Sequence, residues 1–148
     1  MIDELLKKMQ IKAGETVFVL NLPEELRTSF LSSNQVIAGF PQDTTPYSIL
    51  IFVKSKAEIK DAAKTIKPET LEATHLWFAY PKKSSKKYNS EITRDTGWNL
   101  LGEAGFEPVR QISISDDWSG LRFRKFEEIK KFTRNFAISS KGLKQINK

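Results

Sequence analysis

Three nearly continuous runs of apolar residues mark the first part of the chain. They are Thr16–Asn21 (TVFVLN), Ser48–Val53 (SILIFV) and Thr74–Tyr80 (THLWFAY). A strand with one face in water alternates apolar and polar residues, whereas a continuous apolar run is typical of a strand that is buried on both faces. The three runs therefore predict central strands of a sheet. Gln35–Phe40 is a shorter strand candidate between the first two.

Segments with helical spacing alternate with these strands. Pro23 suits the first turn of a helix, and the two glutamates that follow it suit the positive end of the helix dipole. Ser55, with a glutamate three residues later, predicts a capping box. The expected helices are Ile2–Gln10, the segment PEELRTSFL that begins at Pro23, Lys56–Ile66 and Glu91–Ala104.

Two further strands, Glu107–Ser115 and Leu121–Arg124, flank a turn at Asp116–Gly120 and predict an antiparallel hairpin. Strands that alternate with helices are typical of an α/β fold with a mostly parallel sheet. The predicted architecture is a Rossmann-like three-layer sandwich with a C-terminal antiparallel hairpin. In such sheets ligands bind beyond the carboxyl ends of the strands.

The length of 148 residues is typical of one domain. Residues 1–138 are predicted to form this single α/β domain, which would include a last helix with apolar residues from Phe126 to Phe136. Residues 139–148 have no apolar face, and we expect them to form a flexible basic tail.

The net charge of +6 is unevenly distributed. Residues 80–98 carry a net charge of +3 and residues 122–148 carry +7, whereas residues 1–79 and 99–121 carry −1 and −3. Basic segments attract nucleic acid or an acidic partner. The alternative is that the C-terminal segment is simply solvated.

Composition excludes several classes of site. The chain has no cysteine, which removes disulfides, thiolate metal ligands and cysteine nucleophiles. His75 is the only histidine, and no spacing of carboxylates around it indicates a metal site or a Ser-His-Asp triad. No apolar run approaches the roughly 20 residues of a membrane span, and the N-terminus lacks the apolar core of a secretory signal. We therefore expect a cytoplasmic protein with no membrane association and no metal.

The stretch Tyr80–Trp98, YPKKSSKKYNSEITRDTGW, carries the clearest candidate site. It follows the third buried strand and would lie at the carboxyl edge of the sheet, with the start of the helix predicted near Glu91 facing the same space. Lysines supply positive charge, serines supply hydroxyls, and Tyr80 could stack on a ring. The stretch therefore predicts an anion site, although a solvated basic loop is the alternative.

Three other residues join the candidates. Arg94 and Asp95 fall in the first turn of the predicted helix, where Asp95 suits the dipole and Arg94 does not. A locally unfavourable charge can mark a site, and the alternative is a pair between Arg94 and Glu91. Trp118 follows two aspartates in the hairpin turn, and either folds onto the sheet or stands at the mouth of a cleft. The candidate ligand-binding residues are Tyr80, Lys82, Lys83, Ser84, Ser85, Arg94, Asp95 and Trp118.

The segments LLGEAGFEPV and KPETLEATHLWFAYPK, together with the order of elements, resemble class I S-adenosylmethionine-dependent methyltransferases over roughly residues 14–124. The resemblance implies a glycine-rich turn after the first strand, an acidic residue after the second, and in some members an Asp- or Asn-Pro-Pro-aromatic motif after the fourth. Here the turn reads NLPEEL, only Asp43 offers the acid, and Ala79-Tyr80-Pro81-Lys82 lacks the catalytic polar group. The fold is therefore expected without the cofactor and without a catalytic residue.

Three runs resemble an uncharacterised bacterial domain family of unknown function. They are Tyr80–Ser85, the R-D-x-x-W run Arg94–Trp98 and the W-S-x-L-R-F-R run Trp118–Arg124. This resemblance supports the fold and implies no activity.

Three hypotheses follow. The first is a non-enzymatic or degenerate methyltransferase-like domain that binds an anionic small molecule or an acidic partner at the Tyr80–Arg94 edge. The second is an enzyme that acts on a phosphorylated or carboxylated substrate at the same edge. Lys82, Lys83 and Arg94 would be its electrostatic clamps, and Asp95 or Tyr80 its acid or base. The third is a nucleic-acid-binding accessory protein that uses the basic C-terminal segment.

Overall fold

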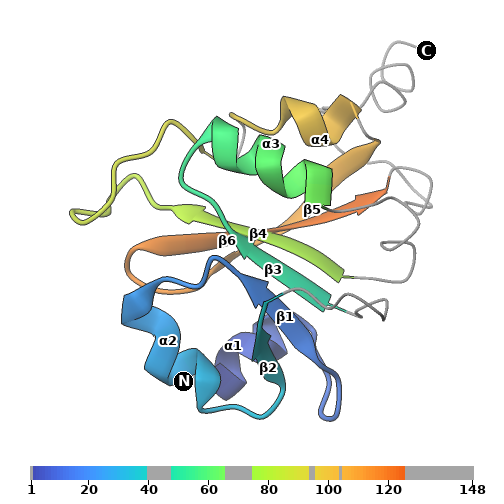
Figure 1. The fold of residues 1–148 in the computed structure, drawn as a ribbon, viewed down its shortest axis with the longest axis vertical. Coiled ribbons are helices and arrows are strands. Elements are labelled where there is room, and N and C mark those ends of the chain that lie inside the picture. Colours follow the sequence, from blue (N-terminus) through green and yellow to red (C-terminus); the bar gives the residue numbers. More distant parts are fainter. Residues whose placement is uncertain (1, 40–47, 66–74, 94–95, 104, 126–148) are drawn as a thin grey trace.

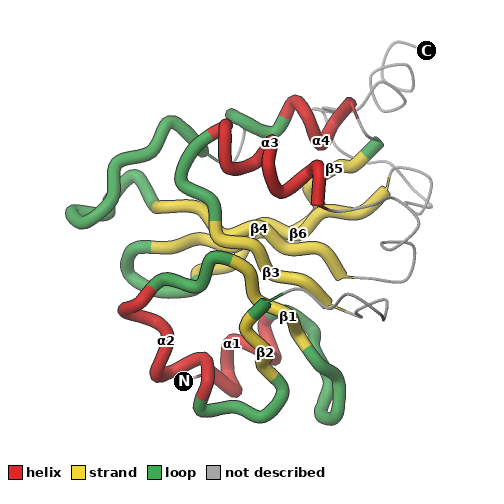
Figure 2. The backbone as a smooth tube through the Cα atoms, viewed as in Figure 1, coloured by secondary structure: helices red, strands yellow, loops and turns green. Residues whose placement is uncertain are grey.

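The computed structural model describes residues 2–39, 48–65, 75–93, 96–103 and 105–125, and Figures 1 and 2 show their arrangement. Helices and strands alternate along the chain up to a final hairpin. The elements are α1 (Ile2–Lys8), β1 (Val17–Leu20), α2 (Glu24–Leu31), β2 (Val36–Ala38), β3 (Ser48–Phe52), α3 (Lys56–Thr65), β4 (His75–Pro81), α4 (Asn99–Glu103), β5 (Phe106–Ser113) and β6 (Trp118–Lys125).

Within the described ranges the strands form one six-stranded sheet in the order β2-β1-β3-β4-β6-β5. β1 pairs in parallel with β2 and β3, and β3 pairs in parallel with β4. β6 is antiparallel to both of its neighbours, β4 and β5. The fold is thus mixed α/β with a mostly parallel sheet, and the predicted C-terminal antiparallel hairpin is confirmed.

Apolar side chains pack on both faces of this sheet. One cluster joins residues of α3 and α4 to Ile49, Phe78 and Phe123, and the other joins residues of α1 and α2 to Leu50 and Trp77. Figure 1 shows α3 and α4 above the sheet and α1 and α2 below it. Every residue of β3 is buried, which confirms the expectation drawn from its continuous apolar run.

The chain turns in opposite directions on leaving β1 and β3. From β1 it passes through α2 to the outer strand β2, and from β3 it passes through α3 to β4 on the other side. The boundary between β1 and β3 is therefore a topological switch point, where ligands of α/β sheets commonly bind.

Two helix starts follow their sequence signals. α2 begins at Glu24, directly after Pro23, and α3 begins at Lys56, directly after Ser55. The Ser55 hydroxyl caps α3, because it accepts a hydrogen bond of 3.2 Å from the backbone N–H of Glu58. The serine half of the predicted capping box is thus confirmed, and the Glu58 carboxylate lies 3.5 Å from the Ser55 hydroxyl.

The helix predicted over Glu91–Ala104 is wrong for most of its length, because α4 spans only Asn99–Glu103. Gly97 adopts a φ of +105°, which a right-handed helix does not allow. Before it, Thr93 and Thr96 exchange backbone hydrogen bonds of 3.1 and 3.4 Å and close a turn. The described part of the connection from β4 to α4 is therefore a loop, as Figure 2 shows in green, and no helix begins near Glu91 among these residues.

β6 begins three residues earlier than predicted, at Trp118. The turn is tighter than its polar sequence indicates, because the backbone N–H groups of Ile114 and Ser115 both donate to the Trp118 carbonyl, at 3.0 and 3.1 Å. In the outer strand β5 the pairing register shifts between Pro108 and Arg110.

The predicted helix within residues 126–138 and the predicted tail 139–148 lie outside the described residues. Among the helices that the structure describes, none has the length and apolar character needed to cross a membrane.

Candidate functional site

Two cavities open beside the carboxyl ends of the central strands. The first, which we call the edge cavity, has a volume of about 470 Å³ and lies beside the end of β4 and the hairpin. It is lined by Tyr80, Pro81, Lys82, Lys83, Ser84, Ile92, Thr93, Gln111 and Ser119. The second, the switch-point cavity, has a volume of about 570 Å³ and lies beyond β1 and β3.

Tyr80 forms a wall of the edge cavity. Its side chain is buried, and its ring packs edge-on against Trp98 with 5.7 Å between ring centroids. Its hydroxyl accepts a hydrogen bond of 2.9 Å from the Gln111 amide. The ring is therefore engaged in the core, and the polar edge formed with Gln111 is the part that lines the cavity.

Lys82 is fixed at the start of the loop that runs from residue 82 to residue 90. Its backbone N–H donates to the Asp117 carbonyl at 2.8 Å, and its ammonium donates to the Ser113 hydroxyl at 2.7 Å. An ammonium has three N–H donors, so two remain for another acceptor. Lys83 and Ser84 follow as exposed residues of the same lining.

Ser85 and Trp118, which the sequence placed in the same site, lie elsewhere. The Ser85 hydroxyl donates to the Asp117 carboxylate at 2.8 Å and accepts the backbone N–H groups of Lys87 and Tyr88, so it shapes the loop. Trp118 is buried on the opposite face of the sheet from Tyr80, against Phe52, with 4.9 Å between ring centroids. Trp118 lines the switch-point cavity, and Arg94 and Asp95 fall outside the described residues.

The switch-point cavity has an aromatic wall and charged residues of both signs. Phe52, Tyr88 and Trp118 supply the wall, and the charged lining residues are Glu24, Glu25, Lys54, Glu58 and Lys87. Asn21 directly follows β1 and has a φ of +59°. Its side-chain amide donates to the Phe52 carbonyl at 3.2 Å, which ties the ends of β1 and β3 together.

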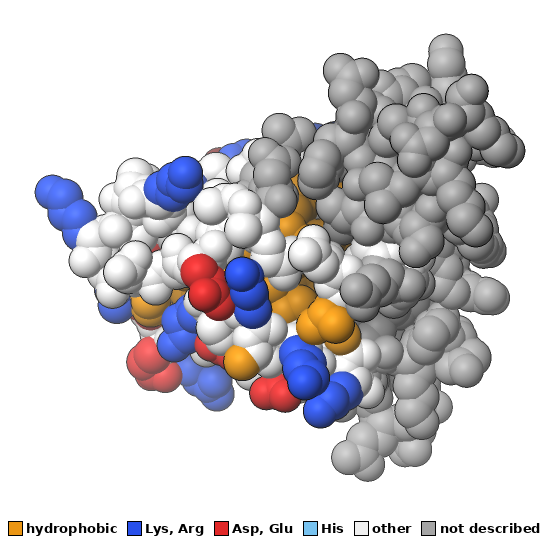
Figure 3. Space-filling model, turned by 90° about the horizontal axis from the view of Figure 1, so that it is seen from above, with side chains coloured by type: hydrophobic (Ala, Val, Ile, Leu, Met, Phe, Trp, Pro, Cys, Tyr) orange, Lys and Arg blue, Asp and Glu red, His pale blue; other side chains and the backbone are white. Residues whose placement is uncertain are grey.

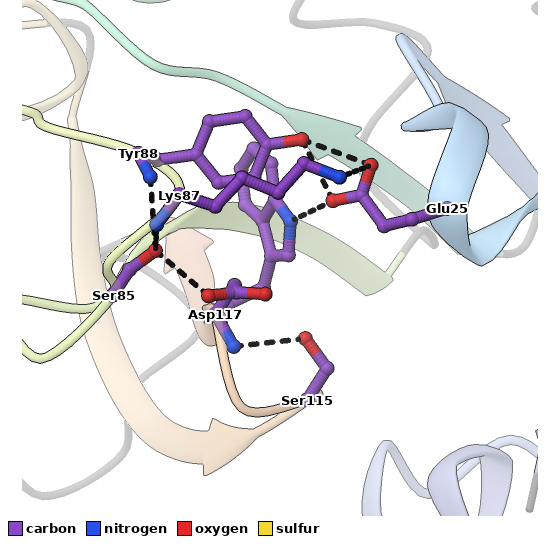
Figure 4. A network of polar contacts seen from close by, with 7 residues as sticks. Glu25, Ser85, Lys87, Tyr88, Ser115 and Asp117 are labelled. Atoms are coloured by element: carbon purple, nitrogen blue, oxygen red, sulfur yellow. Dashed lines mark hydrogen bonds and ion pairs between the residues drawn. The ribbon is translucent and has the colours of Figure 1, made fainter.

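Glu25, in the first turn of α2, is the centre of a polar network over this cavity (Figure 4). The Tyr88 hydroxyl lies 2.9 and 2.7 Å from its two carboxylate oxygens. The Trp118 indole N–H donates to one of these oxygens at 3.3 Å, and the Lys87 ammonium forms an ion pair with the other at 3.4 Å. Glu25, Lys87, Tyr88 and Trp118 are referred to below as the Glu25 network.

The network shifts two pKa values in opposite directions. Burial acts to raise the pKa of Glu25, but the hydrogen bonds from Tyr88, its own backbone, Trp118 and Lys87 outweigh burial and lower it to about 2. Burial, together with the hydrogen bond to the Glu25 carboxylate and its charge, raises the pKa of Tyr88 to about 12. The carboxylate is therefore ionised and the phenol is neutral throughout the ordinary pH range.

The sequence indicated some of the polar residues at these cavities and missed others. Tyr88 lies in the basic stretch but has no local signal, because its partner Glu25 is 63 positions away. Gln111 lies in the strand β5, where an exposed polar residue is ordinary and gives no signal of a site. Glu25 was expected only to suit the positive end of the helix dipole.

The residues at the switch point do not fit S-adenosylmethionine, the cofactor implied by the methyltransferase resemblance. The turn after β1 contains no glycine, and Pro23 has no backbone N–H to offer. The Glu25 carboxylate already takes the hydroxyl, indole and ammonium donors of this region. No chemical step through this cofactor follows from these residues.

His75 lies at the other end of β4 from the edge cavity. Burial lowers its pKa, and the positive charge of Arg122 acts in the same direction. No group of three histidine or acidic side chains within the described ranges has the geometry to hold a metal ion.

No protein-family model matches the chain, and no curated protein matches it in sequence. The resemblance to an uncharacterised bacterial family therefore stays a prediction.

Several solved structures are similar at a distance. A LepI variant in complex with SAH and a substrate analogue has a TM-score of 0.49 at 12% identity over 83% of this chain. LepI in complex with SAM has a TM-score of 0.49 at 12% identity over 84% of this chain, and this chain spans only 39% of the length of either LepI chain. A SAM-dependent methyltransferase from Aquifex aeolicus has a TM-score of 0.46 at 15% identity, over 82% of this chain and 88% of its own. These likenesses are too distant to carry an argument about the site or its ligand.

Proposed function

We propose that the chain is a non-enzymatic, methyltransferase-like binding domain, and that it takes the anionic group of a small molecule or acidic partner in the edge cavity. The observation that carries this proposal is the pair of lysines, Lys82 and Lys83, in the cavity lining. Neither ammonium forms an ion pair with a carboxylate of the described residues, so both charges are available to a ligand.

The other lining groups suit the same class of ligand. Ser84 and Ser119 bring hydroxyls to the cavity, and Gln111 and the Tyr80 hydroxyl form its polar edge. Hydroxyl and ammonium donors are the groups that recognise carboxylate and phosphate oxygens. Pro81 and Ile92 offer a smaller apolar surface for the body of a ligand.

The basic character is local. Seen from above in Figure 3, basic and acidic side chains are interspersed over the described surface, and basic side chains stand out at the left end, where the 82–90 loop lies. An anion would therefore be attracted to the loop itself. The attraction should weaken with salt, because exposed charges are screened beyond about 8 Å at physiological ionic strength.

A binding role is preferred to catalysis because of the chemistry of the lining. The enzymatic alternative needs a general acid or base. Of its two candidates, Tyr80 is buried, and its hydroxyl accepts a hydrogen bond from Gln111. Asp95 lies outside the described residues and does not enter this comparison.

Titration of the ¹⁵N-labelled protein with inorganic phosphate, followed by amide NMR at low and moderate salt, tests the proposal. We expect saturable shifts at residues 80, 82–84, 111 and 119. Lys82→Ala and Lys83→Ala should each weaken binding about threefold to tenfold, as expected for the loss of one contact that is exposed to solvent. Lys86→Ala is the matched control, because it removes the same charge from the same loop at a position outside the cavity lining. Equal weakening by all three variants would mean that phosphate meets only a solvated basic surface.

A further inference from the structure

Glu25 occupies the place at which this type of sheet receives a ligand. It lies in the first turn of α2, just beyond the carboxyl end of β1 and beside the switch point. The first turn of a helix attracts negative charge, since its backbone N–H groups lack partners and the helix dipole is positive there. In this chain the negative charge at that place belongs to the protein itself.

The donors around this carboxylate come from segments that are remote in sequence. Tyr88 and Lys87 belong to the 82–90 loop, and Trp118 begins β6, 93 positions from Glu25. Figure 4 shows the Tyr88 and Lys87 side chains reaching from the loop towards Glu25 on α2. A hydroxyl, an indole N–H and an ammonium thus converge on one carboxylate, as they would on the anionic group of a ligand.

We infer that Glu25 is an internal anion of the switch-point cavity, which takes the donors that an external carboxylate would meet there and holds the 82–90 loop over the cavity. This inference is independent of the function proposed for the edge cavity. It also accounts for the poor fit of a cofactor at the switch point, because the donors are already occupied.

The loop has separate anchors at its two ends. At its start the backbone of Lys82 bonds to Asp117, and at its end the Ser90 hydroxyl donates to the Lys54 carbonyl at 2.8 Å. Glu25 is the contact between the middle of the loop and α2. The Ser85 hydroxyl, which donates to Asp117, is a further anchor that does not involve Glu25. Removal of Glu25 should therefore loosen the loop around Lys87 and Tyr88, and leave the Ser85 anchor, the loop ends and the sheet in place.

Glu25→Ala should convert the internal anion site into a site for an external one. The Trp118 indole N–H resonance reports directly on the vacated position, because this N–H donates to Glu25. We expect the resonance to move in Glu25→Ala and to return towards its wild-type position, saturably, as sodium acetate is added at constant ionic strength. Glu24→Ala is the matched control, because Glu24 is the adjacent carboxylate of the same helix turn and makes no hydrogen bond or ion pair within the described part of the chain. Neither the control nor the wild type should respond to acetate.

Hydrogen exchange of residues 86–89, the part of the loop that contacts Glu25, gives the second readout. It should be about tenfold faster in Glu25→Ala than in Glu24→Ala, the factor expected for the loss of one charge-assisted hydrogen bond, and acetate should slow it again. Glu25→Gln keeps the volume of the side chain and covers the case in which the alanine variant does not fold. It should exchange faster than wild type and ignore acetate, since its amide fills the site. An indole resonance that is unmoved by acetate in Glu25→Ala, or unchanged exchange in Glu25→Gln, would overturn the inference.

Discussion

Glu25 and Tyr88 stabilise each other only while one is ionised and the other is neutral. The pKa of Glu25 is about 2 in the folded protein, below its ordinary value of 4.5, and that of Tyr88 is about 12, above its ordinary value of 10. The stability contributed by Glu25 is thus present above pH 4.5 and is lost as the pH falls towards 2. The contribution of Tyr88 is present below pH 10 and is lost as the pH rises towards 12. The network is insensitive to pH between these limits.

Comparison of the stability of the wild type and of Glu25→Gln across the acid range tests the direction of this pH dependence. The wild type should be more stable above pH 5, and its advantage should shrink as the pH falls towards 2. We expect an advantage of at most about 1 kcal/mol, because the carboxylate is partly exposed and its interactions are screened by solvent. Urea unfolding at pH 7, 5 and 3 measures the free energy of unfolding of both proteins. The difference between the two values removes the contribution of the other carboxylates, which both proteins share. A difference that grows towards low pH would contradict the folded-state pKa.

At the scale of single residues, sequence showed which chemistry is present but not which groups meet. Lys82, Lys83 and Ser84 were predicted together and do line one cavity, because they are consecutive residues at the end of a predictable strand. Trp118 was assigned to the same site but lies against the other face of the sheet. The face on which a side chain falls depends on the strand register, and a one-residue shift reverses it.

At the scale of elements, the central strands were predictable because their apolar runs are continuous. The failure at Glu91–Ala104 has an equally local cause: the apolar spacing there indicated a helix, whereas Gly97 and the turn between Thr93 and Thr96 break it. A glycine within a helical pattern is tolerated in many helices, so the sequence alone does not decide between the two.

The cap of α3 provides a test at this scale. Ser55→Ala should destabilise the protein by about 1 kcal/mol, because the Glu58 N–H loses its acceptor at the helix start. Ser55→Gly is the control, since glycine at this position costs only a few tenths of a kcal/mol relative to a capping side chain. Chemical unfolding of both variants decides the matter, and equal losses would show that the hydroxyl contributes nothing specific.

At the scale of the whole molecule, the sheet order places the two cavities on either side of the central strands, one beyond β1 and β3 and the other beside β4 and β6. Sequence predicted the carboxyl edge as the place of the site. It could not predict that this edge carries two separate cavities, since their separation depends on the face of the sheet on which each loop residue lies.

S-adenosylmethionine provides the test at this scale. We expect the chain not to bind it with useful affinity, because the turn after β1 lacks glycine and its glutamates would repel the carboxylate of the cofactor. Calorimetric titration of the purified protein measures this directly. A dissociation constant of about 10 μM or tighter, which corresponds to about −7 kcal/mol, would refute the expectation and favour an enzyme.

The register shift in β5 affects how the molecule meets other chains. β5 is one of the two outer strands of the described sheet, the other being β2. An uninterrupted outer strand offers a row of N–H and C=O groups on which a foreign strand can add. The shift lies between Pro108, which has no N–H, and Arg110, which exposes a charge. Both features interrupt the row near its middle. This rim of the protein is therefore protected against strand addition and the aggregation that it seeds.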